Sequence, residues 1–265
     1  ENRELDPYGK GEYYSLMGIL VFGLFLMVSS VDLISVYLSL EIVSIMSFIL
    51  SGYLKGDKRS NEAALKYVIY GAFSSGVMLY GMSLVYGLTG STNFFDIQKV
   101  LTENAGNIDL VLIIAIVMIL VGFGYKISMV PFHFWTPDVY EGAPTTITAF
   151  LSVAPKAGGL ALFIRFFHQA MSDGVAMEGN GLLTETDLPW PQIIAVLAVA
   201  TMTLGNLVAL QQKSIKRMLA YSSVAHAGYM LMAIPVLSAE GIQAIMIYLV
   251  MYLFMNLGAF FVVID

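Results

Sequence analysis

The sequence contains no cysteine and few charged residues, and each shortage excludes a class of function. Without a thiolate, the chain cannot bind an iron–sulfur cluster through cysteine, attach a haem covalently or form a disulfide. Asp, Glu, Lys and Arg make up 12% of its 265 residues, roughly half of their share in soluble domains. Hydrophobic residues make up 58% and gather in long runs, which is typical of integral membrane proteins.

These apolar runs predict an all-α, polytopic membrane helix bundle in which residues 1–265 form a single membrane domain. Each run has close to the roughly 20 residues that a helix needs to cross a bilayer. The expected spans are about 13–30, 32–54, 62–88, 109–142, 144–171, 190–210, 217–235 and 240 onward, with a polar loop from 87 to about 107. The chain begins at Glu1 without a methionine and stops inside an apolar run at Asp265. We therefore expect a fragment of a longer protein.

The fourth expected span contains a break in its helix. Apolar sequence runs past Lys126 and then meets Pro131 and Pro137, and proline interrupts the hydrogen bonds of a helix. Irregular backbone at membrane depth is tolerated only where protein buries it or where it lines a wet cavity. The helix either crosses completely by Ser128 or crosses together with the broken piece 131–142.

The distribution of basic residues favours one broken crossing. The loops 55–60 and 211–217 hold six of the thirteen lysines and arginines, whereas the acidic loop 172–189 has none. With a single broken crossing, both basic loops fall on one face, which the positive-inside rule makes cytoplasmic. Two separate crossings would place the basic loops on opposite faces.

The spacing of the spans also indicates an inverted repeat. One five-helix unit would cover residues 13–171, and a second would begin at 190 and run to 265. Five spans separate the two starts, so equivalent helices would run in opposite senses, as in many transporters whose sites lie at broken helices. Few residues match between the units, Tyr67 with Tyr248 among them, so the prediction depends on spacing.

Lys126 and Lys156 are the main candidates for a functional site. Lys126 lies about 17 residues after Asp109, roughly 25 Å along a helix, and Lys156 lies about 12 residues into its span, roughly 18 Å. A charge at the bilayer centre costs about 3 kcal/mol on insertion scales, and desolvation lets a buried amine release its proton. The alternatives are a lysine that reaches the interface past Pro131 and a structural kink at Pro155 with a paired lysine.

Glu41 and Lys66 are further candidates. Glu41 lies about 14 Å into its helix, where a carboxylate needs a cationic partner or a proton. Lys126 and Lys66 are the expected partners, and an ion pair that only pins two helices is the alternative. Lys66 lies about one turn from its cytoplasmic end, so it can also extend to the surface or pair with Glu62 at the i−4 position.

The remaining polar residues give weaker indications. His133 and His226 could relay protons, because an imidazole can accept at one nitrogen and donate from the other; each could equally be a packed, hydrogen-bonded residue. Asp138 and Glu141 follow the break and are expected to cap its helix, with proton guidance as the alternative. No pair of histidines has metal- or haem-site spacing on one helix face, so we expect charge relay without a cofactor in this chain.

Three blocks of sequence resemble the antiporter-like membrane subunits of respiratory complex I, and two of them look most like its subunit N branch. The blocks are GYKISMVPFHFWTPDVYEGAPTTITAFLSVAPKAG, YGAFSSGVMLYGMSLVYGLTGST and IKRMLAYSSVAHAGYML. The resemblance implies two inverted five-helix repeats, each with a broken helix. It also implies that Glu41 is the buried acid of the second span, Lys66 the lysine of the next helix, Lys126 the broken-helix lysine, Lys156 the connecting lysine and His226 the histidine of the seventh span.

The same resemblance implies proton translocation within an NADH:quinone oxidoreductase, with the redox cofactors held by other subunits. The implied partners are neighbouring membrane-arm subunits and the lipid bilayer, without nucleic acid, in a bacterial inner membrane or an energy-transducing organelle membrane. The alternatives are a subunit of an Mrp-type sodium/proton antiporter and a purely structural spacer. Sodium prefers a cluster of oxygen ligands, whereas the buried candidates here are mostly amines.

Overall fold

The computed structural model describes residues 10–103, 110–172, 188–236 and 238–264, and these residues fold into helices joined by short connections. Eight of the helices are long and apolar enough to cross a membrane. The elements are α1 (Lys10–Ser29), α2 (Leu33–Ser51), α3 (Lys58–Thr89), α4 (Phe94–Glu103), α5 (Leu110–Ile127), α6 (Trp135–Gly142), α7 (Thr145–Ala170), α8 (Trp190–Ala209), α9 (Ile215–Leu231), the 3-10 turn η2 (Ile234–Val236) and α10 (Ala239–Ile264).

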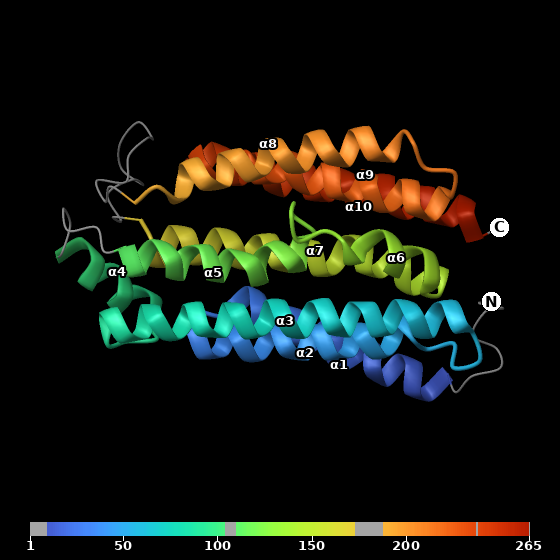
Figure 1. The fold of residues 1–265 in the computed structure, drawn as a ribbon, viewed down its shortest axis with the longest axis horizontal. Coiled ribbons are helices and arrows are strands. Elements are labelled where there is room, and N and C mark those ends of the chain that lie inside the picture. Colours follow the sequence, from blue (N-terminus) through green and yellow to red (C-terminus); the bar gives the residue numbers. More distant parts are fainter. Residues whose placement is uncertain (1–9, 104–109, 173–187, 237, 265) are drawn as a thin grey trace.

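The long helices lie along one axis in three layers (Figure 1). The first layer holds α1, α2 and α3, the middle layer α5, α6 and α7, and the third layer α8, α9 and α10. The middle layer packs against both others, through α3 on one side and through α9 and α10 on the other. Its spans α5 and α7 are the most enclosed of the eight, so polar side chains on them lie inside protein.

The break in the fourth span is confirmed. Helix α5 ends at Ile127, α6 begins at Trp135, and the two lie end to end along α3 (Figure 1). Ser128 has a positive φ of 65°, a conformation that a helix cannot contain, and Pro131 cannot donate a backbone hydrogen bond. Helix α5 has 18 residues and alone has the length and hydropathy of a span, but α6 continues in its direction and completes the crossing.

The helix directions agree with an inverted arrangement. Helix α1 runs opposite to α8, α2 opposite to α9 and α3 opposite to α10, and the α2–α3 and α8–α9 connections lie at the same end (Figure 1). These connections are the basic loops of the sequence. Most of the expected acidic loop 172–189 falls outside the described residues. The division into units at 13–171 and 190–265 stays a prediction.

One expected loop is a helix. The polar stretch after residue 87 contains α4, which directs Phe94 and Ile97 into the protein and leaves Phe95 and Lys99 exposed. Apolar residues three apart on a short polar segment are the pattern of an amphipathic helix. Helix α4 packs against the end of α7, where Phe94 meets Phe166 at 5.6 Å between ring centres.

Candidate functional site

The two deep lysines are enclosed by protein. Lys126 is 3% exposed in the last turn of α5, and Lys156 is 1% exposed in α7. The Lys126 ammonium donates to Ser44 Oγ at 3.1 Å, on α2. The Lys156 ammonium donates to the carbonyl and hydroxyl of Ser223, at 2.8 and 2.7 Å, on α9. The alternative in which Lys126 reaches the interface is wrong. The two amines face opposite outer layers from the middle layer.

A small cavity beside Lys126 also contains the predicted acid. Its volume is about 20 Å³, close to the least that a water molecule requires. It is lined by Leu40, Glu41, Ser44, Gly71, Ser75, Met78, Gly122, Tyr125 and Lys126, a set that we call the Lys126 cavity. Glu41 accepts a hydrogen bond from Ser75, and among the described residues no ion pair joins Glu41 directly to Lys126. A serine therefore contacts each charged group inside one shared cavity.

Two glycines bring α2, α3 and α5 close enough to form this cavity. A Cβ atom at Gly71 would lie 2.4 Å from the Phe48 ring, and one at Gly122 would lie 2.4 Å from the sulfur of Met78. Real Cβ contacts are essentially never so short, so a side chain at either position would force Phe48 or Met78 to shift. Small residues serve this purpose at many membrane helix interfaces.

The surroundings of Lys156 contain hydroxyl and carbonyl groups. Ser223 Oγ donates to the Ala220 carbonyl at 2.8 Å and lies 3.3 Å from the hydroxyl of Tyr140 on α6. One turn before Lys156, the carbonyl of Ser152 accepts a hydrogen bond from Tyr252 on α10, at 3.1 Å. No carboxylate lies within ion-pair distance of Lys156 in the described residues, so the alternative of a lysine paired with an acid at the Pro155 kink finds no support there.

The two predicted histidines have different environments. His133 lies in the break and is 4% exposed, and its Nδ1 has no protein partner among the described residues. The hydroxyls of Ser128 and Thr136, also in or beside the break, are likewise buried without a protein partner in that part of the chain. Buried polar atoms of this kind bind ordered water in most proteins. His226 Nδ1 lies 2.5 Å from the hydroxyl of Tyr248, between α9 and α10.

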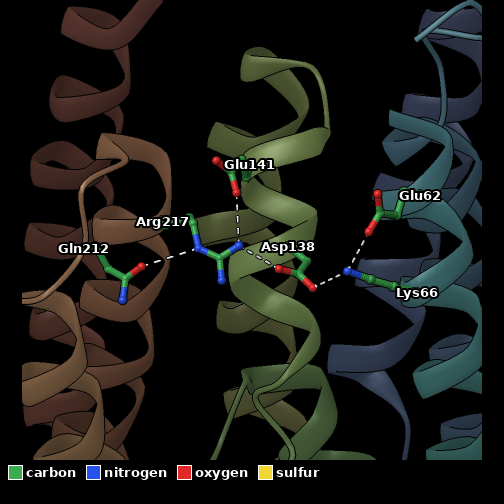
Figure 2. Close-up of polar contacts among 6 residues, drawn as sticks. All are labelled: Glu62, Lys66, Asp138, Glu141, Gln212 and Arg217. Carbon is green, nitrogen blue, oxygen red and sulfur yellow. Dashed lines mark hydrogen bonds and ion pairs between the residues drawn. The ribbon is translucent and has the colours of Figure 1, made fainter. Parts of the chain in front are cut away.

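Lys66 belongs to a second group of charges, which joins α3, α6 and α9. Figure 2 shows Asp138 between Lys66 and Arg217, each 2.7 Å from a different carboxylate oxygen. Lys66 also pairs with Glu62 at 2.8 Å, and Arg217 pairs with Glu141 at 3.0 Å. We call these five residues the charged cluster. Lys66 therefore does not pair with Glu41, and its pairing with Glu62 is confirmed.

The charged cluster corrects the expectation that Asp138 and Glu141 cap a helix. The residue before α6 is Phe134, and no side chain caps the helix start. A cavity of about 380 Å³, which we call the vestibule, lies against the cluster. It is lined by Arg59, Glu62, Ala63, Lys66, Asp138, Glu141, Gly142 and Arg217. It lies at the end of the bundle that holds the two basic loops.

Sequence reasoning missed several of these contact residues. Ser44 lies one turn after Glu41 on the same helix, so spacing alone could have placed it beside a buried acid. The other missed residues contact partners far away in the sequence, and no local pattern indicates such pairings. They are Ser223, Tyr140 and Arg217. The described residues contain no group of three His, Asp or Glu side chains that could hold a metal.

The comparisons with known proteins agree with this geometry. The family model described as the NADH:quinone oxidoreductase/Mrp antiporter transmembrane family matches residues 30–265. The chain is 49% identical to NADH-quinone oxidoreductase subunit N of Anaeromyxobacter sp. strain Fw109-5 over 271 residues, covering all of this chain and 52% of the relative. It is 55% identical to NADH-quinone oxidoreductase subunit N 2 of Chloroherpeton thalassium, covering 96% of this chain and 48% of the relative.

A solved structure has the same fold. A chain in respiratory complex I from Thermus thermophilus with bound aureothin superposes with a TM-score of 0.78 at 34% identity. The match covers 97% of this chain and 52% of that chain. The chain thus spans about half the length of these curated relatives and of the matching chain in the solved structure.

Proposed function

Because the chain belongs to the NADH:quinone oxidoreductase/Mrp antiporter transmembrane family, we propose that it moves protons across a membrane as a membrane-arm subunit of an NADH:quinone oxidoreductase. The two relatives with this name support the proposal. The chemistry would come from the buried Lys126 and Lys156 of the middle layer and from Glu41, which is half-buried on α2. The chain has about half the length of these relatives, so the complete protein would add further groups to the path.

One observation carries the proposal: two lysines lie inside protein without a contacting carboxylate among the described residues. Each buried amine costs about 3 kcal/mol on insertion scales, and a well-packed apolar replacement of a buried charge is often neutral or stabilising. Lys126 and Lys156 also face opposite outer layers of the bundle. A group that only stabilised the fold would not require this arrangement, whereas a proton relay across the layers does.

The proposed path begins at Glu41 and Lys126. While the Glu41 carboxylate is ionised and close, its charge favours the ammonium form of Lys126. When the neighbouring subunit weakens this interaction, Lys126 Nζ releases its proton to water in the break. A neutral Lys156 amine accepts the proton, held by the hydroxyl and carbonyl of Ser223. His226 then offers a next acceptor on α9, and His133 lies beside the route in the break.

We propose that the redox cofactors are carried by other subunits. The absence of cysteine excludes cysteine-held iron–sulfur clusters from residues 1–265. The partners would be adjacent membrane-arm subunits and lipid, in a bacterial inner membrane or an organelle membrane that conserves energy. Co-purification of the full-length chain with a peripheral arm containing flavin and iron–sulfur clusters would support this assignment.

The substitution Lys126→Met in the intact complex tests the proposal. We expect fewer protons pumped per electron in sealed vesicles, because a thioether cannot bind and release a proton. The matched control is Lys99→Met on α4, which removes an exposed lysine far from the path. Assembly is checked from the abundance of the purified complex. A normal ratio in an assembled Lys126→Met complex would remove this residue from the path.

A sodium/proton antiporter is the second candidate, and the family description itself names Mrp antiporters. Glu41, Ser44 and Ser75 place three oxygen-bearing side chains around the Lys126 cavity. The ammonium of Lys126 on the same cavity opposes a sodium ion, which favours protons. Sodium-dependent proton flux in vesicles without a redox substrate would select the antiporter, and unchanged pumping after both lysines are neutralised would select a structural spacer.

A further inference from the structure

The vestibule and the Lys126 cavity approach each other along one face of α3. Ala63 lines the vestibule, and Gly71 lines the cavity. These positions are eight residues apart, roughly 12 Å along a helix. Tyr67 lies midway on the same face and is 1% exposed. A single aromatic side chain on α3 thus lies about one turn from the vestibule at the end of the bundle and about one turn from the Lys126 cavity.

Three other aromatic rings hold Tyr67 in this position. Trp135 stacks on Tyr67 with 4.3 Å between ring centres and 14° between planes. Phe48 meets it edge-on at 4.8 Å, and Tyr125 lies at 5.9 Å. The Tyr125 hydroxyl donates to the Tyr67 carbonyl at 2.9 Å, and the Trp135 indole nitrogen donates to the Tyr125 carbonyl at 3.0 Å. We call Phe48, Tyr67, Tyr125 and Trp135 the aromatic layer.

We propose that the stacked Tyr67 and Trp135 form a closed gate between the vestibule and the Lys126 cavity, and that movement of α6 opens it. The proposal rests on the proposed function, because it names the entry route for protons to Glu41. Aromatic rings without water between them interrupt a chain of hydrogen bonds. In this proposal, protons that travel from the vestibule to Glu41 along this face of α3 pass after the stack separates.

Helix α6 is the element that can separate the stack. It carries Trp135 at its first turn and Asp138 one turn later. The break after Ile127 detaches α6 from α5, so α6 can shift without bending a continuous helix. In the closed state, Lys66 and Arg217 hold Asp138 from both sides (Figure 2). Separation of these two ion pairs would free α6 to move Trp135 away from Tyr67.

Residues 1–265 contain no cysteine, so a single introduced cysteine can serve as a reporter in this part of the protein. We would place one cysteine by Met78→Cys, at a residue that lines the Lys126 cavity. Its modification by a small, charged thiol reagent added at the basic face of membrane vesicles would be followed on the full-length assembled chain. If the open state holds roughly 0.1–10% of the molecules, Tyr67→Ala should accelerate modification by about 10- to 1,000-fold. Phe73→Ala, an exposed aromatic on α3, should leave the rate unchanged.

A second pair of variants keeps the test decisive. Arg59→Cys on the vestibule wall should react rapidly in every background and reports on reagent access. If Tyr67→Ala prevents assembly, Trp135→Leu removes the other half of the stack.

Rapid modification of Met78→Cys without either gate substitution would overturn the proposal. Equal slow rates with and without the gate substitutions, while Arg59→Cys still reacts, would overturn it too. Thiol rates do not depend on pumping, so a failed Lys126→Met test and a failed gate test remain distinct.

Discussion

At the scale of single residues, a serine contacts each of the two buried lysines and the half-buried Glu41. Ser44 binds Lys126, Ser75 binds Glu41, and Ser223 binds Lys156. A hydroxyl can accept from an ammonium and can also donate to a neutral amine, so it suits a group that changes protonation. A carboxylate in the same place would fix the lysine in its charged form.

Ser223→Ala should destabilise the protein through Lys156. The amine keeps the carbonyl of residue 223 but loses the hydroxyl at 2.7 Å. A hydrogen bond to a charged group contributes about 1.5–3 kcal/mol, and a neutral one about 1 kcal/mol. Thermal unfolding in detergent measures the loss of stability, and Ser222→Ala, at the residue before Ser223, is the control. Equal unfolding temperatures for the two variants would show that the hydroxyl of Ser223 does not hold Lys156.

At the scale of elements, α6 depends on ion pairs more than on its own length. It has only 8 residues and no side-chain cap at its start, and so short a helix is not stable alone. Asp138→Asn should loosen its attachment to α3 and α9. Two half-exposed ion pairs are lost, each about 0.2–1 kcal/mol, and the unfolding temperature should fall accordingly. Glu103→Gln at an exposed position of α4 is the control, and a fall of equal size there would contradict the argument.

The sequence predicts which elements exist better than which residues meet. Pro131 and the two basic loops were enough to place the broken crossing, because proline chemistry and charge bias act locally. Helix α4 was missed, although Phe94 and Ile97 carried its period. The pairing of Asp138 with Lys66 and Arg217 spans 72 and 79 residues, and no local pattern encodes such a contact. Which partner a buried charge finds depends on helix packing, which is decided by the whole bundle.

At the scale of the whole molecule, the middle layer connects two outer layers. The corresponding helices of these layers, such as α1 and α8, run in opposite directions. Lys126 faces the first layer, Lys156 faces the third, and α6 contacts both through the charged cluster. Glycines bring α8 and α9 together inside the third layer: a Cβ at Gly228 would lie 2.6 Å from the backbone nitrogen of Met202. The proposed path would thus run sideways through the bundle, from the first layer to the third.

The placement of the basic loops at one end of the bundle predicts the orientation of the protein in its membrane. Lys58 and Lys213 lie at the end with the basic loops, and Lys99 lies at the other end on α4 (Figure 1). Because the basic end should be cytoplasmic, Lys58→Cys and Lys213→Cys should react with an impermeant thiol reagent only in inside-out vesicles. Lys99→Cys should react only in right-side-out vesicles. Reaction of Lys58→Cys and Lys213→Cys from opposite faces would mean that α5 and α6 cross separately, and the gate at Tyr67 would then lack a vestibule on the cytoplasmic side.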